Sequence, residues 1–123
     1  MSMALAIEPR RAPVAANDQL RWVDVGAIDD VPRLGARRVE APGGEIAVFR
    51  TARDGFFALD NRCPHRGGPL SEGIVHGESV TCPLHSLVLS LIDGTAENPD
   101  EGCATSHPVR VEAGRVLLGL VRG

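Results

Sequence analysis

The stretch Asn61-Arg62-Cys63-Pro64-His65-Arg66-Gly67-Gly68-Pro69-Leu70, followed by Val80-Thr81-Cys82-Pro83-Leu84-His85, decides how this chain is expected to fold. Each half supplies one cysteine and one histidine, and sixteen residues separate His65 from Cys82. A proline follows each cysteine and disfavours helical backbone at the residue before it. The pattern therefore predicts two extended loops that bring two thiolates and two imidazoles to one metal centre.

A C-x-H…C-x-x-H arrangement is the ligand set of a Rieske [2Fe–2S] cluster, in which two histidines replace two cysteines on one iron. Thiolates suit iron and sulfide because they are soft anions, and imidazole is a neutral ligand that also suits iron. We therefore predict that Cys63, His65, Cys82 and His85 hold such a cluster. Two neutral ligands make the cluster less negative, so it accepts an electron more readily. The expected role is electron transfer.

The residues around the cysteines suit cluster loops. Gly67 and Gly68 can adopt backbone angles that other residues avoid, and their N–H groups are expected to donate hydrogen bonds to sulfur. Three leucines are expected to exclude water from the cluster: Leu70, Leu84 and Leu87.

High-potential Rieske proteins carry an additional cysteine in each loop, and Ser and Tyr hydroxyl groups that donate to the sulfurs. Gly68 and Leu84 stand where the additional cysteines would be, Leu87 stands where the serine would be, and the chain has no tyrosine. The resemblance therefore implies the low-potential, ferredoxin-like class.

Other cysteines and histidines have simpler explanations. Structural zinc is an alternative for paired Cys and His, but zinc sites usually begin with C-x(2–4)-C rather than C-x-H. Cys103 is left over, and a small buried hydrophobic residue is its expected role. His76, in a probable turn, and His107, before Pro108, are expected at the surface and not among the ligands.

Composition indicates one small domain. The 123 residues carry a net charge of −3, which gives no basis for binding nucleic acid or an anionic membrane. Arg10-Arg11 looks like a twin-arginine export signal, but residues 12–18 lack an apolar run of signal-peptide length. Three cysteines make no disulfide framework and suit a reducing compartment. We expect a flexible tail over residues 1–18, a domain over 19–123, and a cytoplasmic location.

Short strands separated by turns are the dominant pattern. The chain has 14 glycines and 9 prolines, and no segment keeps a helical period. Strands are expected over residues 20–25, 37–41, 45–51, 56–60, 79–81, 87–92, 109–112 and 115–120. One helical turn is expected at 27–31, and Trp22 is expected to anchor the core. These features predict an all-β domain of about ten short antiparallel strands in stacked sheets or a sandwich, with the cluster loops at one tip.

Residues 61–75 and 80–85 together resemble the small subunit of assimilatory NAD(P)H-dependent nitrite reductase, and the similarity covers about residues 20–121. The cluster motif alone identifies a Rieske domain. The Cys-Pro-Leu-His form of the second loop and the Asp100-Glu101-Gly102-Cys103 segment favour this subunit. Ser86 and Leu87 depart from the usual glycine and aromatic residue, which implies altered packing beside His85.

The resemblance implies an electron-transfer subunit of an oxidoreductase that reduces nitrite to ammonium. Its partner would be a large subunit with flavin, a [4Fe–4S] cluster and sirohaem. This chain has no Gly-x-Gly-x-x-Gly fingerprint and is expected to be inactive alone. Two alternatives are a Rieske ferredoxin that serves a ring-hydroxylating oxygenase, and a non-redox regulatory or assembly module with zinc or an empty site.

Overall fold

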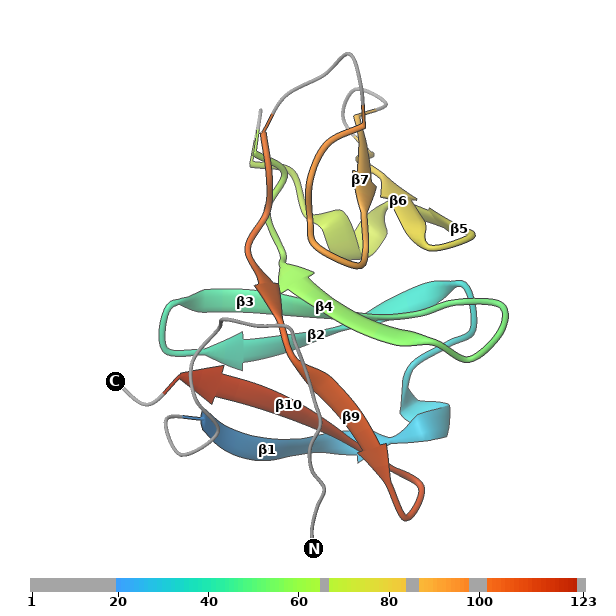
Figure 1. Cartoon of the computed structure of the whole chain (residues 1–123), viewed down its shortest axis with the longest axis vertical. Coiled ribbons are helices and arrows are strands. Elements are labelled where there is room, and N and C mark those ends of the chain that lie inside the picture. Colours follow the sequence, from blue (N-terminus) through green and yellow to red (C-terminus); the bar gives the residue numbers. More distant parts are fainter. Residues whose placement is uncertain (1–19, 65–66, 84–86, 98–101, 122–123) are drawn as a thin grey trace, which may run out of the picture.

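The computed structural model describes residues 20–64, 67–83, 87–97 and 102–121. These residues form ten strands in three antiparallel sheets and two short 3-10 helices, which confirms the predicted all-β class (Figure 1). Two sheets make a base, and the third belongs to a smaller upper lobe that we define as the described residues from Asn61 to Ala104. The predicted tail, residues 1–18, lies outside the described residues.

The first sheet of the base joins the two ends of the described chain. It contains β1 (Leu20–Ala27), β9 (Val109–Glu112) and β10 (Arg115–Val121) in the order β1-β10-β9. The β9–β10 hairpin turns at Ala113 and Gly114, whose φ angles are +50° and +76°. Two consecutive positive φ angles are typical of the tight turns that match the twist of a hairpin.

The second sheet of the base contains β2 (Gly35–Ala41), β3 (Gly44–Arg50), β4 (Phe56–Asp60) and β8 (Ser106–His107) in the order β2-β3-β4-β8. Strand β3 is buried on both faces over its last five residues. Successive side chains of a strand point to opposite faces. Ile46 and Val48 accordingly pack in one core, and Ala47 and Phe49 pack in another.

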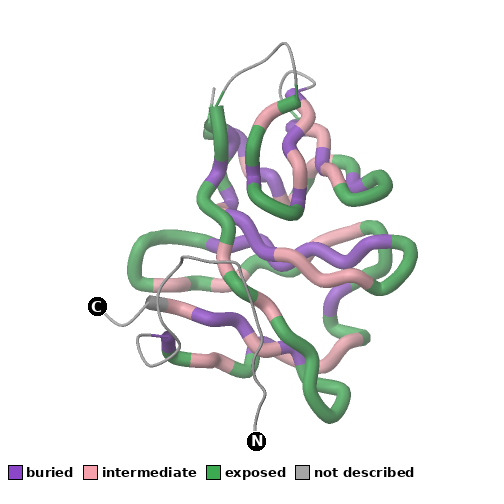
Figure 2. The backbone as a smooth tube through the Cα atoms, in the orientation of Figure 1, coloured by how far each residue is buried: buried purple, intermediate pink, exposed green. Residues whose placement is uncertain are grey.

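The two cores lie below and above this sheet. The base core contains Val25, Val31, Ile46, Val48, Ala58, Val116 and Leu118. The upper core contains Ala47, Phe49, Leu59, Cys63, Leu70, Val75, Val80, Cys82, Leu87, Leu89, Leu91 and Ala104. Figure 2 shows the buried positions continuing from the base into the upper lobe. Strands β3 and β4 therefore each contribute side chains to both cores.

The upper lobe is built from very short elements. Its sheet contains β5 (Ile74–His76), β6 (Ser79–Thr81) and β7 (Val88–Ser90), and η4 (Leu70–Glu72) precedes β5. The central residues of the three strands, Val75, Val80 and Leu89, are paired in register and are buried in the upper core. One face of this sheet therefore packs toward β3.

Most predicted elements are confirmed, with three differences. The expected helical turn is present as η3 (Ile28–Asp30). Strand β5, of three residues, and strand β8, of two, were not predicted. The prediction for Trp22 was wrong, because Trp22 is only partly buried on the outer face of its sheet, where the Arg110 guanidinium lies 4.4 Å from its ring. No helix within the described ranges is long and apolar enough to cross a membrane.

Candidate metal centre

The two predicted thiolate ligands lie in the same buried core. Cys63 is 1% exposed and Cys82 is 2% exposed, and both contribute to the upper core. They come from different segments, since Cys63 follows β4 and Cys82 follows β6. Two cysteines from two loops in one apolar environment are what a cluster with two thiolate ligands requires.

The first loop folds back on itself around Cys63. The Cys63 N–H donates to the Gly68 carbonyl at 2.8 Å, and the Gly67 N–H donates to the Cys63 carbonyl at 2.8 Å. Gly67 has a φ of +72°, a conformation that glycine adopts readily and other residues rarely do. The predicted role of Gly67 as a donor to sulfur was wrong, because its N–H donates to a carbonyl oxygen instead.

A backbone hydrogen bond joins the two sides of the second loop. The Cys82 N–H donates to the Leu87 carbonyl at 2.7 Å. Leu70 and Leu87 are fully or almost fully buried beside the two cysteines, as expected for residues that exclude water. Leu84 lies outside the described residues.

A close approach of backbone to backbone supports the second loop from below. A Cβ added at Gly73 would lie 2.3 Å from the Thr81 carbonyl oxygen, next to Cys82. Only glycine permits this contact between the chain after η4 and strand β6. Sequence reasoning missed Gly73, because a glycine in a glycine-rich chain carries no signal of its own.

The two predicted imidazole ligands, His65 and His85, lie outside the described residues. His76 is exposed and makes a 2.7 Å hydrogen bond with the Thr81 hydroxyl, which confirms its predicted surface position. His107 is partly buried rather than fully at the surface, and its Nε2 lies 2.7 Å from Asp60 Oδ1. Within the described ranges, no three Cys, His, Asp or Glu side chains gather as a metal site.

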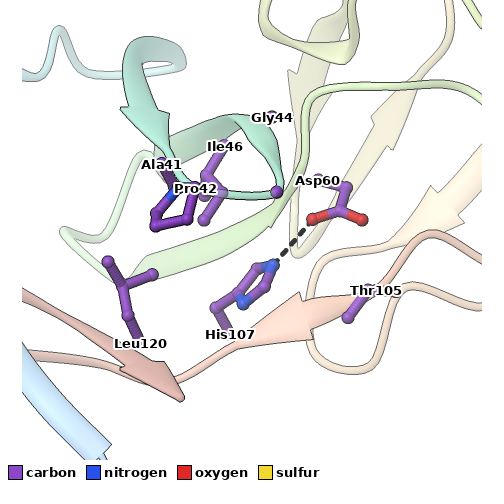
Figure 3. Close-up of a pocket in the computed structure, with 9 residues that line it drawn as sticks. Ala41, Pro42, Gly44, Ile46, Asp60, Thr105, His107 and Leu120 are labelled. Atoms are coloured by element: carbon purple, nitrogen blue, oxygen red, sulfur yellow. Dashed lines mark hydrogen bonds and ion pairs between the residues drawn. The ribbon is translucent and has the colours of Figure 1, made fainter. Parts of the chain in front are cut away.

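The Asp60–His107 pair lines an open hollow of about 290 Å³ beside the start of the first loop. Figure 3 shows His107 turned toward Asp60, with Pro42 and Leu120 on the apolar side of the hollow. Asp60 ends β4 three residues before Cys63, and its N–H donates to the Thr105 carbonyl at 2.8 Å. The side-chain pair and the backbone bond together attach the end of β4 to the segment at β8.

The prediction for Cys103 was wrong, because this residue is exposed. Its backbone forms an isolated bridge with Thr95, and the next residue, Ala104, is 5% exposed in the upper core. Adjacent residues in extended backbone point to opposite sides. Ala104 therefore takes the buried position, and Cys103 faces outward.

A charged turn closes the upper lobe near Cys103. The backbone N–H and the hydroxyl of Thr95 both donate to the Asp93 carboxylate, at 3.0 and 2.7 Å. These hydrogen bonds hold the pKa of Asp93 below its ordinary value. The turn therefore keeps a negative charge in the upper lobe at neutral pH.

One further observation tests whether the site suits a bound group. Ser71, directly after Leu70, has a buried hydroxyl that finds no hydrogen-bond partner among the described residues. Buried hydroxyl groups are nearly always satisfied by protein or by another bound group. Two buried thiols from separate loops are a donor set that fits an iron–sulfur group, and the segment after the first loop has a buried hydroxyl to spare.

Curated relatives of this chain include the ferredoxin components of oxygenase systems. It is 36% identical over 110 residues to the ferredoxin component of the alkene monooxygenase system of Xanthobacter autotrophicus, and the match covers 88% of each chain. It is 32% identical over 98 residues to the ferredoxin component of the naphthalene 1,2-dioxygenase/salicylate 5-hydroxylase systems of Ralstonia sp, covering 79% of this chain and 93% of the relative.

Solved structures with this fold come from two kinds of system. A chain in the complex of reduced oxygenase and oxidized ferredoxin of carbazole 1,9a-dioxygenase superposes with a TM-score of 0.72 at 28% identity, covering 83% of this chain and 95% of that one. A structure described as a nitrite reductase NADPH small subunit superposes with a TM-score of 0.70 at 27% identity, covering 80% and 98%. An NADH-dependent nitrite reductase small subunit of Mycobacterium tuberculosis reaches 0.77 at 24% identity, covering 85% and 98%, and at that identity shows the fold alone.

The family itself is shown by a match over most of the folded chain. Residues 21–108 match the Rieske [2Fe-2S] domain family, and this range includes both ligand loops and all the strands of the upper lobe. The buried pair Cys63 and Cys82 agrees with the thiolate half of the cofactor that this family carries. The chain belongs to the Rieske [2Fe–2S] domain family, and its cofactor is a Rieske [2Fe–2S] cluster.

Proposed function

We propose that this chain is a Rieske ferredoxin that carries single electrons to the oxygenase component of a multicomponent oxygenase system. In this proposal Cys63 and Cys82 bind one iron, and His65 and His85 bind the other. The observation that carries the proposal is the burial of the two cysteines, from separate loops, in one core. The protein is a non-catalytic component and has no turnover of its own.

The extent of the sequence similarity supports the oxygenase assignment. The two ferredoxin relatives are matched over 88% and 93% of their own length, so the likeness is to whole carriers and not to a domain of a larger enzyme. A carrier of this size needs only ligands for a cluster, a fold that shields the cluster and a surface for partners. The ligand loops supply the ligands, and the upper core supplies the shielding.

The second candidate is the small subunit of an assimilatory nitrite reductase. It is supported by the Cys-Pro-Leu-His form of the second loop and by the likeness to the NADPH-type small subunit at 27% identity. In that case the partner is a large subunit that holds the flavin, the [4Fe–4S] cluster and the sirohaem. The cluster and its proposed ligands are the same in both candidates, and only the partner differs.

The chain's own residues prepare the site for electron transfer. The cluster, when bound, supplies a reversible one-electron couple. Leu70 and Leu87 exclude water from the thiolate side, and the backbone bonds of Cys63 and Cys82 hold both loops closed. The site lacks the tyrosine and the inter-loop cysteines of the high-potential class. We therefore place the potential near the low end of the Rieske range, at about −150 mV.

Spectroscopy tests the carrier proposal first. Protein purified without oxygen is expected to be brown, to hold about two irons and two sulfides per chain, and to give a Rieske-type paramagnetic signal after dithionite reduction. The potential follows from titrating that signal. A colourless protein, or one that holds zinc, would contradict the proposal and favour a non-redox module.

Reconstitution then distinguishes the two partners. The naphthalene dioxygenase reductase and oxygenase are assayed without their own ferredoxin, with this chain added in its place. NADH-dependent oxygen uptake with product formation supports the oxygenase role. Parallel addition to a nitrite reductase large subunit measures NAD(P)H-dependent nitrite loss, and stimulation in that assay alone supports the second candidate. The three cysteines without a disulfide framework suit the reducing cytoplasm in which we place either system.

A further inference from the structure

Asn61 is a buried polar residue at the start of the first ligand loop. It follows β4 directly, stands two residues before Cys63, and is 8% exposed. Buried polar residues within the described ranges are few: Arg50, Thr51 and Asn61. A buried amide is costly unless its donor and acceptor atoms are both used. Its contacts therefore indicate what its burial achieves.

The side chain of Asn61 connects two distant segments. Its Nδ2 donates to Glu45 Oε1 at 3.1 Å, and its Oδ1 accepts the N–H of Ser71 at 2.7 Å. Its own backbone N–H also donates to the Glu45 carbonyl at 2.9 Å. Glu45 is near the start of β3, whereas Ser71 lies just after the first loop. Asn61 thus joins both ends of that loop to β3, a strand that contributes to both cores.

The bond to Ser71 also completes a helix end. Ser71 is the second residue of η4, and N–H groups in the first turn of a helix have no partner within the helix. Pro69 occupies the N-cap position and offers no side-chain hydrogen bond. The Asn61 amide oxygen therefore performs, from ten residues away, the role that a capping side chain usually performs.

We propose that Asn61 is the positioning residue of the first ligand loop, and that it keeps Cys63 in its buried place by fastening Ser71, just after the loop, to Glu45 of β3. The proposal builds on the assignment of Cys63 as an iron ligand. The bonds between Cys63 and the glycines shape the interior of the loop, but neither reaches the base. Asn61 supplies the link from the loop to β3.

The chemistry of the two partners requires a side chain at this position that both donates and accepts a hydrogen bond, as the Asn61 amide does. A backbone N–H can only donate and an ionised carboxylate can only accept, so the residue between Ser71 and Glu45 must do both. Aspartate in place of Asn61 keeps the acceptor for Ser71 but has no donor for Glu45. It also sets two carboxylates against each other, that of the buried position 61 and that of the exposed Glu45. The bond polarity can be reversed by placing the amide at position 45 instead.

The test compares Asn61→Asp, Glu45→Gln and the double variant carrying both changes. Each is purified anaerobically with its cluster, and iron release to a chelator is followed by the loss of visible colour. Asn61→Asp is expected to release iron about tenfold faster, because a part-buried hydrogen bond is lost and a repulsion between two carboxylates is added. Glu45→Gln keeps an acceptor for Nδ2 and is expected to stay within about twofold of the parent. The double variant is expected to return to that level.

Two further readouts separate positioning from general stability. The paramagnetic spectrum of the reduced cluster is expected to broaden or shift in Asn61→Asp and to recover in the double variant. Val116→Ala, in the base core and on β10, lowers the unfolding midpoint but is expected to leave the spectrum and the iron release unchanged. Hydrogen exchange of the peptide around Ser71 is expected to quicken in Asn61→Ala, which removes the acceptor, and not in Asn61→Asp.

The outcomes are distinguishable. Equal iron release and equal spectra in the parent and Asn61→Asp would overturn the positioning role while leaving the carrier proposal standing. Failure of Glu45→Gln to rescue Asn61→Asp would also overturn it, since the argument depends on bond polarity. A parent protein that holds no iron would instead contradict the proposed function itself.

Discussion

The base and the upper lobe are held together in different ways. The base has strands of up to eight residues, paired along most of their length, around a core of aliphatic side chains. The upper lobe has strands of three residues, one 3-10 helix, and two cysteines as part of its core. Sheets of such short strands add little stability on their own. The base therefore serves as the scaffold, and the upper lobe is expected to gain stability from the bound cluster.

The base accounts for most of the fold stability and the upper lobe for the redox chemistry. Each region has its own spectroscopic probe. The chain's single tryptophan, Trp22, lies in β1 of the base. Visible absorbance reports the cluster, whose proposed thiolates lie in the upper lobe. The two signals allow each region to be followed separately, so the predictions below, from the largest expected effect to the smallest, ask whether the regions can be uncoupled.

Loss of one proposed thiolate is expected to have the largest effect. Cys63→Ser should abolish the visible colour and the paramagnetic signal, because serine is a poor ligand for an iron–sulfur cluster. Metal binding is coupled to folding. We therefore expect amide exchange to quicken throughout the upper lobe, while Trp22 fluorescence and the far-ultraviolet circular dichroism of the base stay close to those of the parent.

Cys103→Ser is the matched control for this change. Cys103 belongs to the same lobe but is exposed, and its side chain faces away from the upper core. The variant is expected to keep the full iron content and the same spectrum. Iron loss in Cys103→Ser, or an unfolded base in Cys63→Ser, would contradict the division between the two regions.

Two leucine truncations compare the two cores. Leu118 in the base core and Leu70 in the upper core are both completely buried. Each Leu→Ala change leaves a cavity and is expected to cost about 2–5 kcal/mol of unfolding free energy. Urea unfolding followed by Trp22 fluorescence should show the larger loss for Leu118→Ala. Iron release should quicken only in Leu70→Ala, which opens the wall beside Cys63. Faster iron release in Leu118→Ala would show that the two regions are coupled.

The same contrast explains what the sequence revealed. The base strands were predicted closely, since residues 56–60 and 109–112 alternate or run apolar between clear turns. In the upper lobe, β5 was missed, whereas β6, of equal length, was predicted from its place directly before the second cysteine. Strand β8 in the base has two residues and forms only because Ser106 and His107 meet β4 across a long sequence separation. Pairing of that kind leaves no local pattern.

The candidate site divides in a similar way. The proposed ligand residues carry a spacing that is readable from the sequence. The residues that hold the loops in place carry no such spacing, because Asn61 acts through residues 10 and 16 positions away. For Cys103 the prediction followed the general tendency of cysteine to be buried. The local backbone instead buries Ala104, and Cys103 is exposed. Tertiary contacts therefore decide the roles that composition leaves open.

Acid is expected to weaken the base through Asp54. The Arg33 guanidinium, and after it that of Arg50, hold the pKa of Asp54 below its ordinary value. A carboxyl group with a lowered folded-state pKa contributes stability that is complete above its unfolded pKa of about 4 and is lost as the pH falls through the folded value. Asp54→Asn should therefore lower the urea midpoint at pH 6 and flatten its fall toward pH 3.

The substitution is conservative in the backbone, because Asp54 has a φ of +65° and asparagine tolerates this conformation. Asp29→Asn is the control, since its carboxylate is 95% exposed and lies 3.7 Å from Arg50. That variant is expected to follow the parent at every pH. If the urea midpoint of Asp54→Asn depends on pH as that of the parent does, Asp54 does not contribute to the stability of the base.

The smallest effect is expected at the outer face of the base. The Arg110 guanidinium lies 4.4 Å from the Trp22 ring centroid and also pairs with Glu112 at 3.0 Å. At an exposed site a cation–π contact contributes about 0.5–1 kcal/mol. Arg110→Ala should change the Trp22 emission and lower the urea midpoint slightly, whereas Glu112→Gln, which keeps the cation over the ring, should leave the emission unchanged.

Neither variant should alter iron release or the paramagnetic spectrum, because both side chains lie on the base sheet farthest from the cysteines (Figure 1). A spectral change in Arg110→Ala would mean that the outer sheet communicates with the cluster site, and the base could then no longer be regarded as a passive scaffold.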